Sequence, residues 1–305
     1  MWQPYILMLA VEAEGLVKFF GQVAALRGLS MKAPGGVSGL IGPNGAGKTT
    51  TIHILAGLVR PTRGSARVLG FDAVRESTEV RRRARFVLED QELPRHMEVR
   101  RFLEHAARLC GGEPRDARDA LKAVGLWEYS QRVIGSLSAG MLQRLRIAQA
   151  LLGDPELVVL DEPTANLDPL GRAEVLELIA RLRRERGISF LISSHVLPEL
   201  ERVVDWVTII CRGRAVAEGR LSDLMQLGRS GRFRLISSDD ERLALLLREQ
   251  GLDAYVAGGC VVVSARDCWS LYKVLAAINA HDIRVYRVEE EGTSLDEVFR
   301  RVVGG

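Results

Sequence analysis

The stretch LIGPNGAGKTT at residues 40–50 decides the fold of this 305-residue chain. It contains the pattern G-x-x-x-x-G-K-[ST] from Gly42 to Thr49, with every position matched. An apolar run at 36–41 precedes the pattern and a helical pattern at 48–58 follows it, which is the strand–loop–helix context that such a loop requires. Glycines let backbone N–H groups turn inward around phosphates, and the helix N-terminus adds partial positive charge. The sequence therefore predicts a phosphate-binding loop rather than a chance glycine-rich turn.

Two side chains of this loop carry direct chemistry. Lys48 can reach the β- and γ-phosphates of a nucleotide, which makes it a candidate catalytic residue, and the Thr49 hydroxyl is a candidate ligand of Mg²⁺. The residues expected to surround the phosphates form one continuous segment: Gly42, Pro43, Asn44, Gly45, Ala46, Gly47, Lys48, Thr49 and Thr50. Kinases, GTPases, helicases and transport motors all use such a loop, so the loop alone does not distinguish between these classes.

The bulk composition excludes several classes of function. Lys and Arg number 42 against 39 Asp and Glu, and the resulting net charge of +3 is too balanced to indicate a nucleic-acid partner. The basic run RRRAR at 81–85 is interpreted as a solvated helix face rather than a polyanion-binding patch. No apolar run approaches the ~20 residues that cross a bilayer. Residues 1–11 lack the features of a signal peptide; an extra strand or a start at Met8 are the interpretations left open.

The first part of the chain has an α/β pattern. Continuous apolar runs at 156–161 and 188–193 indicate buried parallel strands. Asp168 is expected to cap the helix between them, and Gly187 to end it. Residues from about 92 to 150 carry helical patterns without strands and are expected to form a helical subdomain. These features predict a first domain at 1–228.

A different pattern begins after the predicted linker GRSG. Strand-like and helical segments follow in the order βαββαβ, which is that of a small α+β, ferredoxin-like fold. The expected strands are 232–237, 253–257, 260–264 and 283–288, and the expected helices are 240–251, 267–280 and a last one at 294–302. The sequence therefore predicts a second domain at 229–305.

Polar side chains follow two of the predicted core strands. Asp161 and Glu162 end the run at 156–161, and His195 comes after the run at 188–193. Ligands of an open α/β sheet bind at the carboxyl ends of its strands, so these residues should lie beside the phosphate loop. Asp161 is then a candidate Mg²⁺ ligand, Glu162 could polarise an attacking water, and His195 could bond the γ-phosphate. An exposed acidic turn and a structural histidine are the alternatives, and the shared edge favours the catalytic interpretation.

The segment LSAGMLQRLRIAQALL at 137–152 has two interpretations. Ser138 is a favourable N-cap for an amphipathic helix, and packing alone would explain the apolar residues that follow. A Ser-x-Gly sequence at a helix start, here Ser138 and Gly140, is also an anion site. Since the loop at residues 40–50 already supplies ligands for the phosphates, the second interpretation raises the question of which anion these residues would meet.

Taken in order, LSAGMLQRL and DPELVVLDEPTANLD resemble the signature helix, Walker B strand and D-loop of ATP-binding cassette (ABC) proteins. The resemblance runs from about residue 9 to residue 227. It implies a P-loop ATPase cassette that binds ATP and Mg²⁺ and pairs head to tail with a second cassette, either its own copy or a homologue. In such a pair the signature of one cassette closes on the γ-phosphate held by the other. The resemblance therefore implies that Ser138, Gly140 and Asp168 act in trans.

The resemblance also implies roles within one chain. Glu162 looks like the general base and His195 like the switch histidine. Phe20, in the sequence KFFG, matches the aromatic residue that stacks on adenine, with a core phenylalanine as the alternative. Glu89 aligns with the lid glutamine of the family and is expected to offer an oxygen to hydrated Mg²⁺, while Gln91 is a less favoured stand-in. The signature reads Ser-Ala-Gly-Met in place of Ser-Gly-Gly-Gln, which removes no catalytic group, so an active ATPase is predicted.

The expected function is that of the ATP-binding and ATP-hydrolysing subunit of an ABC transporter, which drives a separate transmembrane permease. The C-terminal ~75 residues resemble the small domain on cassettes of two-component exporters of drugs, antibiotics or lipids. This implies a cytoplasmic protein, peripheral on the inner face of the cell membrane. The alternatives are an ABC ATPase that acts on ribosomes or nucleic acid, and a nucleotide-binding regulatory module without turnover.

Overall fold

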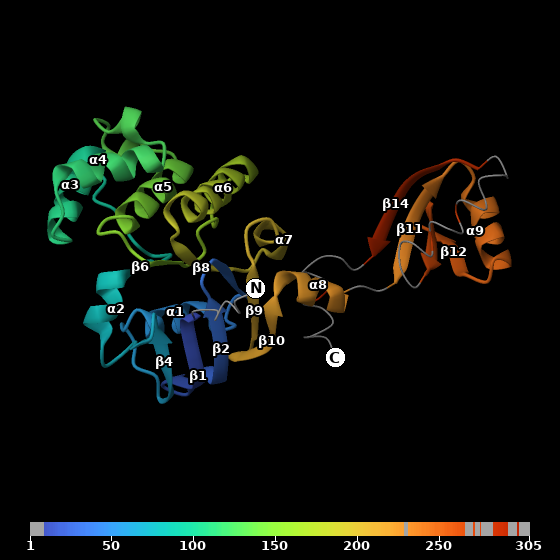
Figure 1. Ribbon diagram of the computed structural model, residues 1–305, viewed down its shortest axis with the longest axis horizontal. Helices are drawn as coiled ribbons and strands as arrows, with labels where there is room; N and C mark the ends of the chain where they lie inside the picture. Colours follow the sequence, from blue (N-terminus) through green and yellow to red (C-terminus); the bar gives the residue numbers. More distant parts are fainter. Residues whose placement is uncertain are drawn as a thin grey trace, which may run out of the picture. The chain divides into compact units, whose positions relative to one another are not determined.

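The computed structural model describes residues 9–228, 231–265, 271, 275, 283–291 and 298 (Figure 1). The chain divides into two compact units, Met1–Leu221 and Ser222–Gly305. The sequence predicts a boundary at 228/229, whereas the units divide at the start of helix α8 (Leu221–Gly228). Of the N-terminal segment considered as an extra strand, residues 1–8 lie outside the described residues and residues 9–11 begin strand β1 (Leu9–Phe20); the last helix, expected at 294–302, falls mostly outside them.

A six-stranded sheet forms the centre of the first unit. Its order is β10-β9-β3-β8-β7-β6, and all neighbours are parallel except β10, which pairs antiparallel with β9. The strands are β3 (Val37–Ile41), β6 (Ala84–Val87), β7 (Leu157–Leu160), β8 (Ser189–Ser194), β9 (Trp206–Cys211) and β10 (Arg214–Arg220). β3 and β7 are buried along their whole length, as expected for a parallel sheet covered on both faces. The carboxyl ends of the parallel strands share one edge.

The helices that follow these strands begin and end where local signals place them. α1 (Lys48–Leu55) starts directly after the phosphate loop and ends with Ala56 as its C-cap, and Gly57 follows with a φ of 70°, in agreement with a helix pattern closed by this glycine. α6 (Pro169–Arg186) has Asp168 as its N-cap and the left-handed Gly187 as its C-cap, as predicted. α7 (Leu197–Leu200) is a single turn after β8.

One detail of the basic run at 81–85 differs from the prediction. Helix α2 (Ser77–Arg83) carries only its first three arginines, which are exposed in the last turn. Ala84 is buried and Arg85 belongs to β6, which pairs with β7. The run therefore crosses from a helix into a strand, because the strand register of β6 buries one residue of the run.

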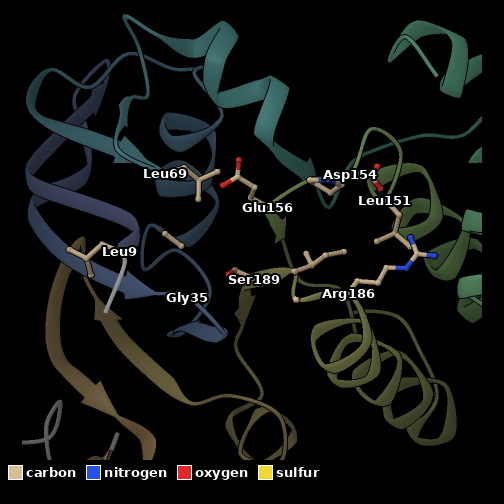
Figure 2. A pocket seen from close by; sticks show the side chains of 12 residues that line it. Leu9, Gly35, Leu69, Leu151, Asp154, Glu156, Arg186 and Ser189 are labelled. Carbon is tan, nitrogen blue, oxygen red and sulfur yellow. The ribbon is translucent and has the colours of Figure 1, made fainter. Parts of the chain in front are cut away.

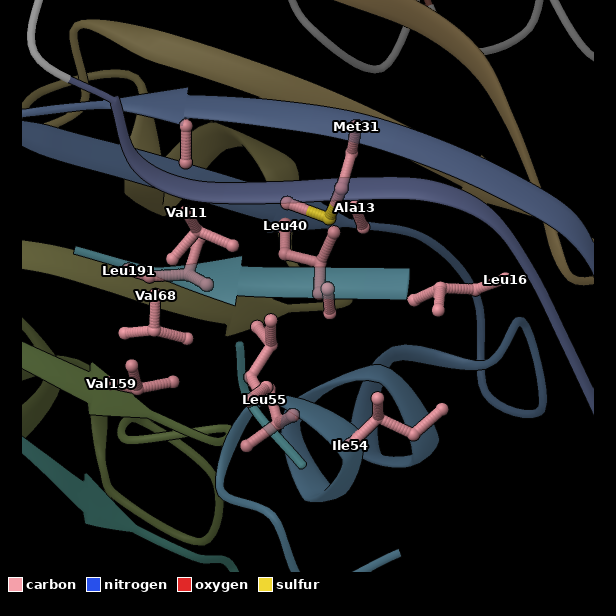
Figure 3. Packing of buried hydrophobic residues seen from close by; sticks show 14 of the residues in the cluster. Val11, Ala13, Leu16, Met31, Leu40, Ile54, Leu55, Val68, Val159 and Leu191 are labelled. Carbon is pink, nitrogen blue, oxygen red and sulfur yellow. The ribbon is translucent and has the colours of Figure 1, made fainter. Parts of the chain in front are cut away.

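A second, antiparallel sheet packs on α1, so that this helix shares one core with both sheets. Its order is β2-β1-β4-β5, formed by β1 (Leu9–Phe20), β2 (Val23–Pro34), β4 (Arg63–Val68) and β5 (Phe71–Asp72). The sequence analysis made no prediction for these segments. Figure 3 shows the shared core, in which Val11 and Leu16 of β1 lie in one cluster with Leu55 of α1 and Leu191 of β8. This core fixes α1, and with it the phosphate loop, between the two sheets.

The segment between β6 and β7 is helical, in agreement with the predicted helical subdomain. It contains α3 (Val99–Leu109), α4 (Pro114–Ala123) and α5 (Ala139–Ala150), with short 3₁₀ turns at Trp127–Tyr129 and Ile134–Ser136. Figure 1 shows α3, α4 and α5 gathered beside α6. In α5 the apolar residues Leu145, Ile147 and Ala148 are buried, whereas Met141 and Leu142 are only half-buried.

The second unit contains an antiparallel sheet of order β12-β13-β11-β14. Its elements are β11 (Arg232–Ser237), α9 (Asp240–Glu249), β12 (Asp253–Ala257), β13 (Cys260–Ser264) and β14 (Val285–Glu291). The second strand of the unit lies at one edge and the fourth at the other, which is the strand order of a ferredoxin-like fold. Phe233, Leu235 and Leu247 lie in its core. The predicted helix at 267–280 falls mostly outside the described residues.

Candidate functional site

The phosphate loop joins the carboxyl end of β3 to α1 in a conformation that depends on glycine. Gly45 and Gly47 have φ angles of 78° and 109°. A Cβ on Gly42 would lie 2.2 Å from the carbonyl oxygen of Ile210, so no side chain fits there. The first N–H groups of a helix have no partner within it, and here they face the loop. The loop is therefore a cradle that fits a chain of phosphates.

Lys48 is buried, and its ammonium group has oxygen partners on two sides. Its side chain is 5% exposed. Nζ donates to the carbonyl oxygens of Gly42 at 2.7 Å and Pro43 at 3.3 Å, and it lies 3.2 Å from Oε1 of Glu162. A buried ammonium needs such partners, because burial without them costs several kcal/mol. A phosphate oxygen can replace the Glu162 carboxylate in this set, so the position fits a lysine that binds the end of a nucleotide.

Ser193 contacts both adjacent acidic residues, the first through its carboxylate and the second through its backbone, and the sequence did not predict this residue. Its Oγ donates to Oδ1 of Asp161 at 2.5 Å and accepts from the backbone N–H of Glu162 at 2.9 Å. Ser193 is fully buried on β8, so it fixes the end of β7 to the neighbouring strand. Two serines at the end of an otherwise apolar run, in FLISSH, are the signal that could have identified it.

His195 and Glu162 are in direct contact, as their common sheet edge predicted. Nδ1 of His195 lies 2.9 Å from Oε2 of Glu162. The carboxylate is only 7% exposed, whereas the imidazole is 43% exposed. Glu162 also has a φ of 47°, a left-handed conformation that non-glycine residues adopt mainly where the surrounding structure requires it. The carboxylate is thus held between the ammonium of Lys48 and the imidazole of His195.

Asp161 has the free oxygen that a metal ligand needs. It is buried, and its Oδ2 has no hydrogen-bond partner in the described part of the chain. Among the same residues, no group of three or more His, Cys, Asp and Glu side chains could hold a metal ion by itself. Mg²⁺ commonly takes one or two carboxylates and completes its shell with substrate phosphates and water. Asp161, with Thr49 at the first turn of α1, therefore fits Mg²⁺ bound together with a nucleotide.

Glu89 follows β6 and lies within the electrostatic reach of these carboxylates. Partial desolvation and the negative charges of Asp161 and Glu162 raise the pKa of Glu89 above its ordinary value. Gln91 has a different environment, since its Nε2 donates to Oε1 of Gln149 on α5 at 3.0 Å. Of the two residues considered for the lid position, the structure places Glu89 near the candidate metal ligand.

Phe20 lies at the end of β1, and its ring is not part of the core. It is 49% exposed, and the ammonium of Lys18 lies 4.9 Å from the ring centroid. The alternative interpretation as a core phenylalanine is therefore wrong. An exposed aromatic face can stack on a nucleotide base, so Phe20 stays a candidate for that contact.

Ser138 and Asp168 lie at the starts of α5 and α6, and each side chain caps its own helix. Oγ of Ser138 accepts from the N–H of Met141 at 3.3 Å, and Oδ1 of Asp168 accepts from the N–H of Gly171 at 3.1 Å. Both residues are exposed, and a Cβ on Gly140 would have no atom within 4 Å. Within the described residues, no hydrogen bond or ion pair joins Ser138 or Asp168 to the phosphate loop.

A separate cavity of about 500 Å³ lies at the opposite edge of the central sheet. Figure 2 shows Gly35, Glu156 and Ser189 among its lining residues. These residues precede or begin β3, β7 and β8, whereas the phosphate loop, Asp161 and His195 follow the same strands. The cavity is therefore at the amino ends of the strands, away from the nucleotide site.

A glycine cradle, a buried lysine and a fixed carboxylate at the carboxyl edge of a parallel sheet define a P-loop nucleotide-binding protein. Among the described helices, none is long and apolar enough to cross a membrane.

The sequence pattern of the ABC transporter family matches residues 26–165. The chain is 33% identical to the bacitracin transport ATP-binding protein BcrA of Bacillus licheniformis, over 97% of each chain. It is 34% identical to the daunorubicin/doxorubicin resistance ATP-binding protein DrrA of Streptomyces peucetius, over 97% of this chain and 92% of that one. A nucleotide-free ATP-binding cassette from an ABC transporter superposes with a TM-score of 0.64 at 26% identity, covering 70% of this chain and 92% of that one. A cassette solved in its ADP conformation gives the same TM-score and identity.

The chain belongs to the ATP-binding proteins of ABC transporters. Its fold is that of a P-loop ATPase cassette, which confirms the predicted fold class. It is a nucleotide-binding ATPase whose hydrolysis is coupled to transport, as the motif order predicted.

Proposed function

We propose that the chain is the ATP-hydrolysing subunit of a two-component exporter. Two cassettes bind two Mg-ATP between them and drive a separate transmembrane permease. The observation that carries the proposal is the similarity over 97% of the chain to proteins named for bacitracin transport and for daunorubicin/doxorubicin resistance. That length includes the C-terminal unit as well as the cassette, so it supports the exporter type and not only the ATPase.

Hydrolysis is assigned to the groups that meet at the carboxyl edge of the central sheet. Lys48 binds the terminal phosphates, and the Glu162 carboxylate accepts a proton from the attacking water. His195 holds that carboxylate through the contact at Oε2 and can itself bond the γ-phosphate. Mg²⁺, when bound, neutralises charge on the phosphates, and Thr49 and Oδ2 of Asp161 are the groups that would hold it, with Glu89 contacting its water shell.

The residues at the helix starts are assigned to the partner cassette's nucleotide. Ser138 and Gly140 at α5 present a hydroxyl and free backbone N–H groups, and a helix N-terminus favours an anion. Asp168 at α6 would contact the partner across the same interface. The exposure of Ser138 and Asp168 supports this assignment, because a site completed by a second chain needs accessible groups on the first.

The permease is proposed to contact the helical subdomain near Glu89. A shallow cavity of about 160 Å³ lies there between β6, α3 and α5, lined among others by Phe86, Gln91 and Leu109. Such a contact would place the cassette, residues 1–228, on the cytoplasmic face of the membrane. Residues 229–305 are proposed to form an accessory domain of the exporter.

The test uses Glu162→Gln as a trap. This variant should bind ATP, lose about 10³-fold in kcat, and accumulate as a dimer in Mg-ATP. Purified with a tag from gently solubilised membranes of its host, it should bring a multi-span protein with it. The matched control is Glu156→Gln, a change at the exposed amino edge of the same sheet that should leave kcat unchanged.

Two results would contradict the proposal. A wild-type rate of ATP hydrolysis in Glu162→Gln would show that Glu162 is not the general base. Recovery of the trapped protein with ribosomes or nucleic acid, and without a membrane protein, would favour the cassette that acts on those partners.

A further inference from the structure

Arg172 joins two segments of the site that are far apart in the sequence. It lies in the first turn of α6, and its Nε donates to the carbonyl oxygen of Leu167 at 2.8 Å, the residue before Asp168. Its Nη1 donates to Oε1 of Glu199 on α7 at 2.6 Å. One guanidinium thus holds the turn that carries Asp168 and the helix that follows His195.

The helix α7 is a single turn. It has four residues and no side-chain cap at its N-terminus. Leu200 is buried and anchors its end, but a cavity of about 520 Å³ lies between α6 and α7, lined by residues that include Ala173, Leu176 and Val203. Close packing therefore does not fix the two helices along this face, and the ion pair of Arg172 supplies a link across it.

The environment of the pair makes this link stronger than a surface salt bridge. The side chains of Arg172 and Glu199 are 34% and 22% exposed, and the short contact is a charge-assisted hydrogen bond. Oε2 of Glu199 is buried and has no hydrogen-bond partner among the described residues, so Arg172 is the partner shown for this carboxylate. A planar guanidinium can serve the carbonyl and the carboxylate together, which an ammonium cannot do with the same geometry.

His195 is placed between two fixed points as a result. Ser194 ends β8 on one side, and Glu199, four residues after His195, is held by Arg172 on the other. A shift of Leu167 and Asp168 would therefore move α7 and alter the contact of His195 with Glu162.

We propose that Arg172 is a positioning residue that couples the Asp168 turn to His195 through Glu199, so that a partner bound at Asp168 is sensed at the catalytic carboxylate. The inference rests on the role of His195 in the proposed function. It names no new catalytic group, because Arg172 acts through the segments it holds.

The experiment is steady-state ATP hydrolysis by the full-length chain. Arg172→Ala should lower kcat about tenfold, because small displacements of a catalytic group are costly. KM for ATP should stay within about twofold, since the nucleotide contacts are untouched. Arg172→Lys should recover only part of the loss. The control is Arg183→Ala, which removes an ion pair with Asp205 at 2.9 Å from the same helix and should leave kcat and KM unchanged.

A double-mutant cycle with His195→Ala separates coupling from a structural effect. In the His195→Ala background, Arg172→Ala should lower kcat by less than about twofold, because its effect passes through the side chain that is already removed. If Arg172→Ala lowers kcat by the full tenfold in the His195→Ala background as well, the two residues act independently. That result would overturn the coupling and leave the role of His195 unchanged. A drop in the folded fraction that accounts for the whole loss of rate would also overturn it. Wild-type kcat in His195→Ala alone would instead refute the proposed role of His195, and the coupling with it.

Discussion

The carboxyl edge of the central sheet and the starts of α5 and α6 hold their candidate residues in different ways. At the sheet edge, Lys48 and His195 each contact the Glu162 carboxylate. At the helix starts, Ser138 and Asp168 are exposed and each accepts a bond from its own helix. One chain thus assembles the first set by itself and presents the second to solvent. The comparison teaches that a local cap can fix a residue that has no partner at the nucleotide site of its own chain; under the proposed function that partner is a second chain.

The largest effect is expected for the residues at the carboxyl edge of the sheet. Lys48→Ala removes a buried cation that contacts Glu162, so ATP binding should weaken strongly and hydrolysis should fall about 10²–10³-fold. Nucleotide binding by equilibrium titration and the steady-state rate measure this. Lys32→Ala, at an exposed lysine, is the control and should change neither quantity. A Lys48 variant with wild-type affinity for ATP would show that the residues at the sheet edge do not form the nucleotide site.

Gly42 in the phosphate loop and Gly140 at the start of α5 allow the two regions to be compared by the same substitution. Gly42→Ala places a Cβ 2.2 Å from a backbone carbonyl, so the fold should lose about 1–3 kcal/mol and ATP affinity should fall. Gly140→Ala has open space around it, so its free energy of unfolding should change by less than about 0.5 kcal/mol. Denaturant unfolding of both variants provides the test. Equal destabilisation by the two changes would show that the helix start is packed as tightly as the loop.

A smaller effect is expected at Phe20, the candidate for stacking on the base. Phe20→Ala should raise KM for ATP by about tenfold, with kcat nearly unchanged, since base stacking on an aromatic ring contributes about 1–3 kcal/mol. Phe19, which is also exposed on β1, offers the matched control Phe19→Ala. If both variants raise KM equally, the stacking contact is not specific to Phe20.

The smallest effect concerns Glu89. Its raised pKa means that the ionised carboxylate weakens the fold at neutral pH, and that this penalty disappears as pH falls through the folded-state pKa. Glu89→Gln should therefore raise Tm at pH 7 by about 1 °C or less, and the gain should vanish near about pH 4. Thermal unfolding at both pH values checks the sign, with Glu92→Gln as the control. A gain that grows on acidification would contradict the assignment.

The parts of the fold and site that the sequence predicts depend on local signals. The loop glycines, the cap of α6 at Asp168 and the apolar runs of β7 and β8 each occupy neighbouring residues, so short patterns identify them. The antiparallel sheet gave no comparable pattern. β1 pairs with β2 through several register shifts and contains Gly15 at a φ of 56°, which interrupts the alternation of buried and exposed residues.

The missed residues act across long sequence separations. Ser193 reaches Asp161 from the adjacent strand, and Arg172 reaches Glu199 from one helix to another. Neither residue type is unusual at its own position, because serine ends many strands and arginine lies on many helix surfaces. Only the register of the sheet and the position of α6 next to α7 in the fold bring these groups to their partners.

The most direct test of the central claim, that two chains complete each nucleotide site, mixes two inactive variants. Lys48→Ala removes the loop function, and Ser138→Arg blocks the helix start of α5. If the groups act in trans, a mixed dimer keeps one intact site, so an equimolar mixture should regain about a quarter of the wild-type ATPase rate. If each site is complete within one chain, the mixture should stay as inactive as its components, and that result would contradict the account.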